Sequence, residues 1–209
     1  MSLVASPLNI VMPITLEGSV VRLDPIRREH AEVFWDVAKD ALGNIFEWIP
    51  YRMKTREDFQ RLVEKAFDEQ ERGESVVFAT VERRSGQVIG STRFMNIDRA
   101  NRRVEIGSTW IAPAWQRTAV NTEAKSLMLR HAFEVWNCFR VELKTDGLNR
   151  RSRNAILHTA QTSDHLDRPR ARHSLLQHPR YGVAGSEGEA GSLACAENRF
   201  KECLSPARR

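Results

Sequence analysis

The sequence predicts an α+β fold in which helices pack against a mixed, mostly antiparallel sheet. Two strand-like runs, at residues 75–82 and 87–97, are joined by a turn at Ser85–Gly86, which favours a pair of strands joined by a short turn. Apolar residues at helical spacing occur both before and after these runs. Helices that accompany an antiparallel-to-mixed sheet indicate a single α+β domain.

Composition limits the function classes. With 209 residues, of which 41% are hydrophobic and 28% charged, the chain suits one domain with a sizeable core. The net charge of +5 and the pI near 9.4 favour anionic partners only weakly, and a basic solvated surface is the simpler interpretation. No apolar run is long enough to span a bilayer, and no signal-type segment precedes the domain.

The three cysteines, Cys138, Cys195 and Cys203, show neither metal-type nor disulfide-type spacing. We therefore expect a cytoplasmic protein without a membrane partner and without a metal site.

The N-terminal part predicts a strand and two helices. Residues 20–23 form the strand, and residues 28–39 carry apolar side chains at helical spacing. Thr55 and Asp58 resemble a capping box, so that a second helix is expected to begin there. The loop 46–51 between the helices reads FEWIPY and contains three aromatic residues.

The segment from Val104 to Glu134 is the most informative part of the chain. It predicts a strand at 103–111, a short loop at 116–121 and an amphipathic helix at 122–136. The first N–H groups of a helix lack intrahelical acceptors, and the helix dipole is positive at that end. This arrangement therefore predicts an anion-binding site.

The last regular elements are a strand at 139–145 and a helix that begins within 149–157. From His158 onward the residues show no sustained helical or strand period. We expect a disordered tail from this point.

Residues 14–157 resemble the GNAT superfamily of acetyl-CoA-dependent N-acyltransferases, and in particular the Rim-type branch that includes ribosomal-protein N-terminal acetylases. The resemblance rests on the segments EIGSTWIAPAWQ, QRTAVNTEAK, VELKTDGLNRRSRNAI and FEWIPY. It implies a domain over 14–157 that uses acetyl-CoA as co-substrate and no metal. The implied reaction is transfer of an acetyl group to a primary amine, of a protein N-terminus or a small molecule, by direct attack on the thioester.

The resemblance also implies a set of cofactor-binding residues around the turn after the fourth strand, whose backbone amides hold the CoA pyrophosphate. Ala119 stands where the family usually has glycine, and Asn121 stands where a small residue is usual. Because glycine lets the backbone approach phosphate closely, the alanine is expected to weaken binding without abolishing it. The segment alone also fits a plain strand-to-helix loop. The implied residues are Ile111, Gln116, Arg117, Thr118, Ala119, Val120, Asn121, Thr122 and Asn149.

Two residues are candidates for the catalytic chemistry. Glu105 alternates with Val104 and Ile106, which places its carboxylate on the opposite face, and the family often has a base on this strand. A solvated or ion-paired strand glutamate is the alternative. Ser152 is a candidate proton donor to the leaving thiolate, but helix capping is the alternative role for both Ser152 and Asn149.

The acceptor side of the site is predicted from side chains that can form a groove wall. Phe46, Trp48 and Tyr51 are the candidate substrate-contacting rings of the loop, although core packing explains any single ring equally simply. Arg93, in the middle of a predicted strand, is a candidate contact for an acidic acceptor.

The segment 158–209 departs from the family, whose members continue with further strands. A shift of one nucleotide in the reading frame over Arg172–Glu189, with the flanking codons included, permits RDTVYYSILDTEWPEVKAKLE, a sequence of the family type. We hypothesise a frameshift near 157–161. Sequencing the coding DNA tests it: codons for Leu175 and Leu176 that cannot give an aromatic residue in the shifted frame would refute it. Without the family's last strands, Val141 and Leu143 are expected on an unpaired edge, which invites strand exchange or a homodimer.

Two further functions stay open at this stage. The substitutions at Ala119 and Asn121, with the missing strands, also fit a catalytically impaired acetyl-CoA-binding protein. A basic nucleic-acid-binding module rests only on the pI and the arginine content, and it would require binding with a steep salt dependence.

Overall fold

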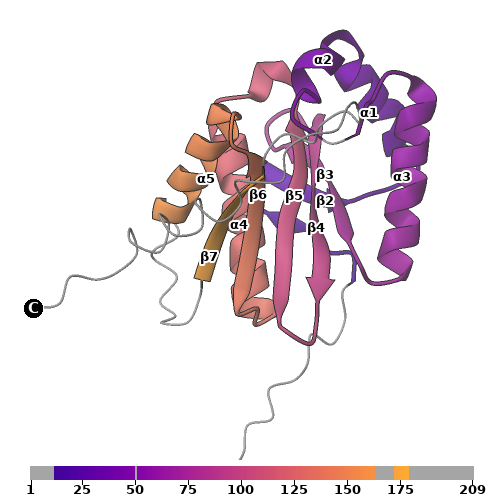
Figure 1. Ribbon diagram of the computed structural model, residues 1–209. Coiled ribbons are helices and arrows are strands. Elements are labelled where there is room, and N and C mark those ends of the chain that lie inside the picture. Colours follow the sequence, from indigo (N-terminus) through magenta and orange to yellow (C-terminus); the bar gives the residue numbers. More distant parts are fainter. Residues whose placement is uncertain (1–11, 50, 163–171, 179–209) are drawn as a thin grey trace, which may run out of the picture.

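The computed structural model describes residues 12–49, 51–162 and 172–178, and its strands and helices are shown in Figure 1. The strands are β1 (Leu16–Glu17), β2 (Val21–Pro25), β3 (Val76–Glu82), β4 (Val88–Asp98), β5 (Arg103–Ile111), β6 (Arg140–Asp146) and β7 (Arg172–His178). The α-helices are α1 (His30–Ala38), α2 (Leu42–Ile45), α3 (Arg56–Glu71), α4 (Ala119–Arg130) and α5 (Arg150–Thr162). Short 3-10 turns cover Lys39–Ala41 and Pro113–Trp115, and a π-helical turn at His131–Val135 continues α4.

The described strands form one sheet whose spatial order follows the chain from β1 to β7. Neighbouring strands are antiparallel from β1 to β5, whereas β5–β6 and β6–β7 are parallel. Each parallel pair is joined by a helical crossover, α4 or α5, because parallel strands cannot be joined by a tight turn. The predicted α+β fold with a mixed, mostly antiparallel sheet is therefore confirmed.

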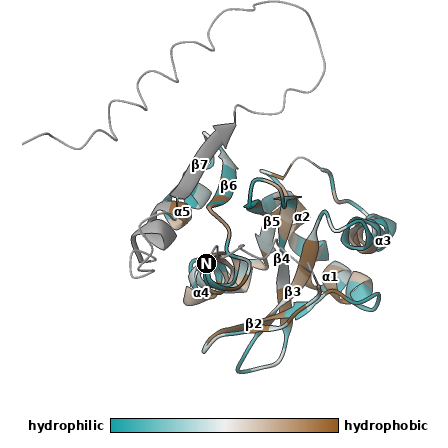
Figure 2. Ribbon diagram, turned by 90° about the horizontal axis from the view of Figure 1, so that it is seen from below, coloured by the Kyte–Doolittle hydropathy of each residue, from teal (hydrophilic) through white to brown (hydrophobic). Residues whose placement is uncertain are grey.

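Helices cover both faces of the sheet. Figure 2 shows α4 and α5 on one side and α1 and α3 on the other. Because side chains alternate along a strand, Phe78 and Phe94 pack in one core with Met128 of α4, whereas Val77 packs in a second core with Phe59 of α3. The sheet is thus held between two apolar layers.

The capping box predicted before α3 is present. The Asp58 backbone N–H donates to the Thr55 hydroxyl oxygen at 3.3 Å, and Asp58 Oδ2 accepts from the Thr55 backbone N–H at 2.9 Å. These two bonds satisfy donors that the first turn of α3 would otherwise leave unpaired. They fix the end of the aromatic loop that follows α2.

Helix α4 begins at Ala119, earlier than the predicted start at Thr122. The reason is Thr118, which has an extended backbone and whose hydroxyl oxygen accepts from the Val120 N–H at 3.4 Å, as an N-cap does. Ala119, Val120 and Asn121 therefore form the first helical turn and are not part of the preceding loop.

The predicted unpaired edge at Val141 and Leu143 is wrong for the described strands. β7 pairs with β6 in parallel from Arg140↔Arg172 to Asp146↔His178, and α5 continues past 157 to Thr162. Strand pairing uses backbone groups, so a segment without an apolar period can still form it. Most of the predicted frameshifted tail, 163–171 and 179–209, lies outside the described residues, and the division into 14–157 and 158–209 stays a prediction.

Candidate active site

Strands β5 and β6 diverge after a short paired stretch. Their pairing runs from Arg103↔Arg140 to Ile106↔Leu143, and then β5 continues to Ile111 without a further partner in β6. The register of β4 against β5 shifts in the same region, and Ser108 has a φ of 46°, which identifies a β-bulge that bends β5. Backbone groups of 107–111 on the β6 side are therefore left without a partner in β6.

Helix α4 begins at the edge of the sheet toward which β5 and β6 diverge. Because β5 and β6 are parallel, the helices that follow them, α4 and α5, both begin at the edge where the two strands end. Gln116 Nε2 donates to the Ile111 carbonyl oxygen at 2.9 Å, and the Thr118 hydroxyl donates to the Trp115 carbonyl oxygen at 2.7 Å. These bonds hold the turn against the end of β5, so that the first N–H groups of α4 lie beside the diverging strands.

The residue with the unusual backbone in this turn is Arg117, whose φ is 62°. Ala119 is the first residue of α4, and its backbone does not have a positive φ. A helical backbone suits alanine, so the replacement of the family's glycine at Ala119 adds a methyl group but no backbone strain. The predicted weakening of binding at Ala119 can therefore come only from the space that its methyl group takes, and not from backbone strain.

Asn149 caps α5. It is buried, and its Oδ1 accepts from the Ser152 backbone N–H at 3.0 Å. This is the alternative role expected for Asn149 from the sequence. Asn149 and Ser152 both lie at the start of α5, beside the end of β6, so their predicted cofactor and proton-donor roles are compatible with their position.

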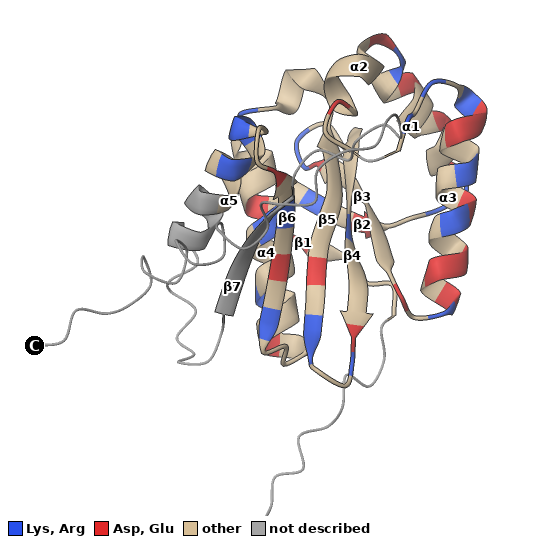
Figure 3. Ribbon diagram, viewed as in Figure 1, with Lys and Arg blue, Asp and Glu red and all other residues tan. Residues whose placement is uncertain are grey.

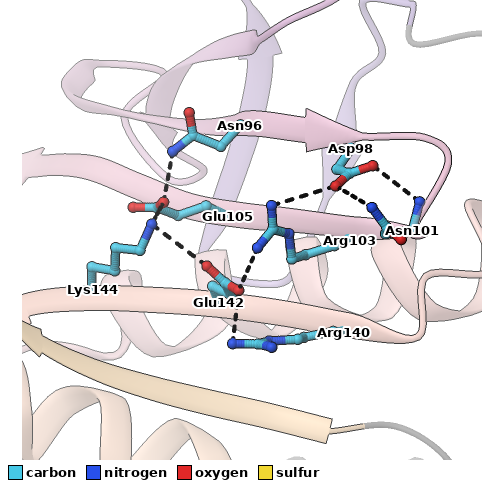
Figure 4. A network of polar contacts seen from close by, with 8 residues as sticks. All are labelled: Asn96, Asp98, Asn101, Arg103, Glu105, Arg140, Glu142 and Lys144. Atoms are coloured by element: carbon cyan, nitrogen blue, oxygen red, sulfur yellow. Dashed lines mark hydrogen bonds and ion pairs between the residues drawn. The ribbon is translucent and has the colours of Figure 1, made fainter.

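Glu105 lies at the centre of a polar network that joins β4, β5 and β6 (Figure 4). Val104 and Ile106 belong to the core on the α4 side, so Glu105 lies on the opposite face, as predicted. It is 6% exposed, and its Oε2 accepts from Asn96 Nδ2 at 2.8 Å and forms an ion pair with Lys144. Glu105 is therefore an ion-paired strand glutamate in this structure, which was the alternative to a catalytic base.

The second carboxylate of the network is Glu142, which is 4% exposed. It pairs with Arg140 at 2.9 Å, with Arg103 at 3.4 Å and with Lys144 at 3.5 Å. Burial lowers the pKa of Lys144, but its contacts with Glu105 and Glu142 outweigh this effect and raise the pKa. Lys144 thus stays charged and holds both carboxylates next to the point where the strands diverge.

The three predicted aromatic residues have different surroundings. Phe46 is buried and its ring packs against Phe59 and Trp110, so it belongs to the core. Trp48 and Tyr51 are half-buried, and the Tyr51 hydroxyl has no hydrogen-bond partner within the part of the chain that the structure describes.

Trp110 is a buried residue next to the candidate site that the sequence analysis did not single out. It lies in the diverging part of β5, is 3% exposed, and its Nε1 has no partner among residues 12–49, 51–162 and 172–178. Its place in EIGSTWIAPAWQ, beside the bulge, was the signal. The structure brings Trp110 and Tyr51 into one aromatic cluster through their shared neighbour Phe46.

Arg93 is buried and forms an ion pair with Glu69 of α3 at 3.0 Å. Its charge is therefore compensated inside the protein. This pairing disfavours the predicted contact between Arg93 and an acidic acceptor, which stays untested.

A second missed residue is Lys125 of α4, which is 8% exposed. Its Nζ donates to Asn121 Oδ1 at 2.5 Å. Burial lowers the pKa of Lys125 to about 8. The sequence held no signal for this burial, because an isolated lysine on a helix is normally exposed.

Neither a metal-binding group nor a membrane-spanning helix is found among the described residues. Within 12–49, 51–162 and 172–178, no three His, Cys, Asp or Glu side chains gather so as to hold a metal ion. In the same ranges, every helix is too short or too polar to cross a bilayer.

Comparison with known proteins identifies the family. A family profile described as an acetyltransferase (GNAT) domain matches residues 21–159, whereas no curated protein matches the chain. A solved GCN5-related N-acetyltransferase from Brucella melitensis is 29% identical with a TM-score of 0.63, and the alignment covers 70% of this chain and 66% of that chain.

Two more distant structures share the fold. Mycobacterium smegmatis RimJ, in complex with CoA-disulfide, is 21% identical with a TM-score of 0.63 and coverage of 73% and 76%. The ribosomal L7/L12 α-N-protein acetyltransferase RimL is 14% identical with a TM-score of 0.62 and coverage of 70% and 80%. Since the profile match spans more than half of the 209 residues, the chain belongs to the GNAT acetyltransferase family.

Proposed function

We propose that this chain transfers the acetyl group of acetyl-CoA to a primary amine by direct attack of the amine on the thioester. The observation that carries the proposal is the divergence of β5 and β6 after the Ile106–Leu143 pair, at the edge where α4 begins. When bound, acetyl-CoA supplies the activated acetyl group.

The described residues fit this co-substrate in two places. The backbone of 107–111, which has no partner in β6, offers N–H and C=O groups to the amide-containing arm of CoA. The first turn of α4, from Ala119 to Thr122, offers N–H groups and the positive end of the helix dipole to the phosphates. Ile111, Gln116, Arg117 and Thr118 shape the turn between these two places.

The proposed reaction needs a proton acceptor and a stabilised oxyanion. Glu105 is the proposed acceptor, since its carboxylate is buried and is held by Lys144 beside the diverging strands. Backbone N–H groups of β5 after the bulge are the proposed donors to the thioester oxygen. Ser152, at the start of α5, is the proposed proton donor to the leaving thiolate.

The acceptor amine is proposed to lie against Trp48 and Tyr51, the two half-buried rings of the aromatic loop. RimL, which shares the fold, is named a ribosomal L7/L12 α-N-protein acetyltransferase. We therefore propose a protein N-terminus as the first acceptor to test and a small-molecule amine as the second.

The substitution Glu105→Gln tests the proposed base. It keeps the shape of the side chain and is expected to lower kcat by on the order of 100-fold or more with unchanged affinity for acetyl-CoA. The matched control is Glu142→Gln, which removes the other buried carboxylate bound to Lys144 but lies on β6. Equal loss of activity in both variants would assign the effect to the network as a whole and contradict a role of Glu105 as base.

A second candidate function is an acetyl-CoA-binding protein with impaired catalysis. The pair between Glu105 and Lys144 favours it, because the carboxylate is already engaged by Lys144 and Asn96 and must leave these contacts to accept a proton from an amine. Release of free thiol with a panel of peptide N-termini and small amines separates the two functions. Tight binding of acetyl-CoA without amine-dependent thiol release would support the binder.

A further inference from the structure

Within the part of the chain that the structure describes, Lys125 is a buried cation without an acidic partner. It is 8% exposed, and among the described residues its one hydrogen-bond partner is the neutral amide oxygen of Asn121 at 2.5 Å. In the sheet, by contrast, the buried Arg93 pairs with Glu69, and the partly buried Lys144 pairs with Glu105. A buried charge that lacks such a partner is costly and therefore calls for a compensating anion.

The ammonium of Lys125 lies near the first turn of α4. Helical side chains lean toward the N-terminus of their helix, and residues four apart lie one above the other. The bond from Lys125 to Asn121 shows this direction and places Nζ beside a first-turn side chain. The ammonium therefore adds to the positive end of the helix dipole.

No acidic residue occurs in the first turn of α4 or of α5. Glu123, the nearest acid along α4, is used elsewhere: its carboxylate accepts from the backbone N–H groups of Ser19, Val20 and Val21 at the start of β2. The start of α5 instead carries Arg150, Arg151 and Arg153, and basic residues are visible there in Figure 3. The first turns of α4 and α5 thus offer no carboxylate to pair with Lys125.

We propose that the Lys125 ammonium, together with the Asn121 side chain that orients it, binds the phosphate groups of acetyl-CoA at the start of α4. This inference rests on the proposed function, since it assigns a charge partner within that same site. The family usually has a small residue at the position of Asn121. In this proposal the Asn121 side chain holds the ammonium in place. The lowered pKa of Lys125 agrees with a charge that awaits an anion, because bound phosphate would raise it again.

The test compares acetyl-CoA with acetyl-pantetheine, which has the same acetylated arm but lacks the phosphates and the adenosine. Wild-type protein and Lys125→Met, which keeps a long side chain in the helix, are titrated with acetyl-CoA and with acetyl-pantetheine by calorimetry. Loss of a charged hydrogen bond is expected to weaken acetyl-CoA binding on the order of 10- to 100-fold and to leave acetyl-pantetheine binding unchanged. The matched control, Arg130→Met, removes a positive charge from the exposed last turn of the same helix and should change neither affinity.

A second readout needs no stable variant. In wild-type protein with isotope-labelled lysine side chains, the NMR-detected pKa of the buried lysine should rise when CoA binds. Equal affinity of Lys125→Met and wild type for acetyl-CoA, or an equal loss for both ligands, would overturn the inference. An absence of acetyl-CoA binding by the folded wild-type protein would instead overturn the proposed function.

Discussion

Neutralising Lys125 by raising the pH is expected to stabilise the CoA-free protein. Burial lowers the pKa of Lys125 from 10.5 to about 8, whereas in the unfolded chain the side chain is exposed and regains the higher value. Between these two values the unfolded chain binds more protons than the folded chain. The free energy of unfolding therefore rises as the pH increases through this interval.

The size of this effect follows from the two pKa values. The difference between 10.5 and about 8, at about 1.4 kcal/mol for each pH unit, gives about 3 kcal/mol. At pH 7 the folded protein carries this cost in full because Lys125 is protonated. Lys125→Met removes the charge and is therefore expected to be more stable than wild type at pH 7.

Urea unfolding, followed by tryptophan fluorescence from pH 7 to pH 10.5, measures the effect. Other groups titrate in this range or near it, such as Cys138, whose thiol pKa burial raises to about 11. They contribute equally to wild type and to Lys125→Met, so the difference between the two proteins isolates Lys125. The stability advantage of the variant should shrink by about 3 kcal/mol as the pH rises. An advantage that stays constant with pH would refute the buried, uncompensated charge.

Two further substitutions test contacts that position the site. Glu123→Ala removes an acceptor of three backbone N–H groups at the start of β2 and should lower the free energy of unfolding by about 2–4 kcal/mol in urea; Glu134→Ala, at an exposed position just after α4, is the control and should change it little. Gly90→Ala should destabilise the β4–β5 pairing, because a Cβ there would lie 2.2 Å from the Trp110 carbonyl oxygen, and a loss of about 1–3 kcal/mol is expected. Gly43→Ala is its control, since a Cβ there meets nothing within 4 Å; equal effects of the two alanines would contradict the close approach.

The sequence alone predicted the elements whose signals are local. The capping box at Thr55 and the strand at 103–111 followed from residues within a few positions of one another, and both are present. The start of α4 was placed too late because the small and polar residues 116–121 were interpreted as one loop. Thr118, a favoured N-cap residue, was the local signal for the earlier start.

Features that depend on distant partners could not be predicted in this way. The pairs Arg93–Glu69 and Lys144–Glu105 join residues from different elements, and no periodicity encodes them. Lys125 was overlooked for the opposite reason: an isolated lysine on a helix is normally exposed, and only the packing of α4 shows that it is buried. The pairing of β7 with β6 uses backbone groups, which leave no pattern in the sequence.

Calorimetric titration of the full chain with acetyl-CoA tests the proposed function most directly. The divergence of β5 and β6 beside the start of α4 predicts saturable binding of one acetyl-CoA per chain, with a Kd below about 1 mM. Protein that unfolds cooperatively in urea, and so is folded, yet gives no saturable heat with millimolar acetyl-CoA would contradict it.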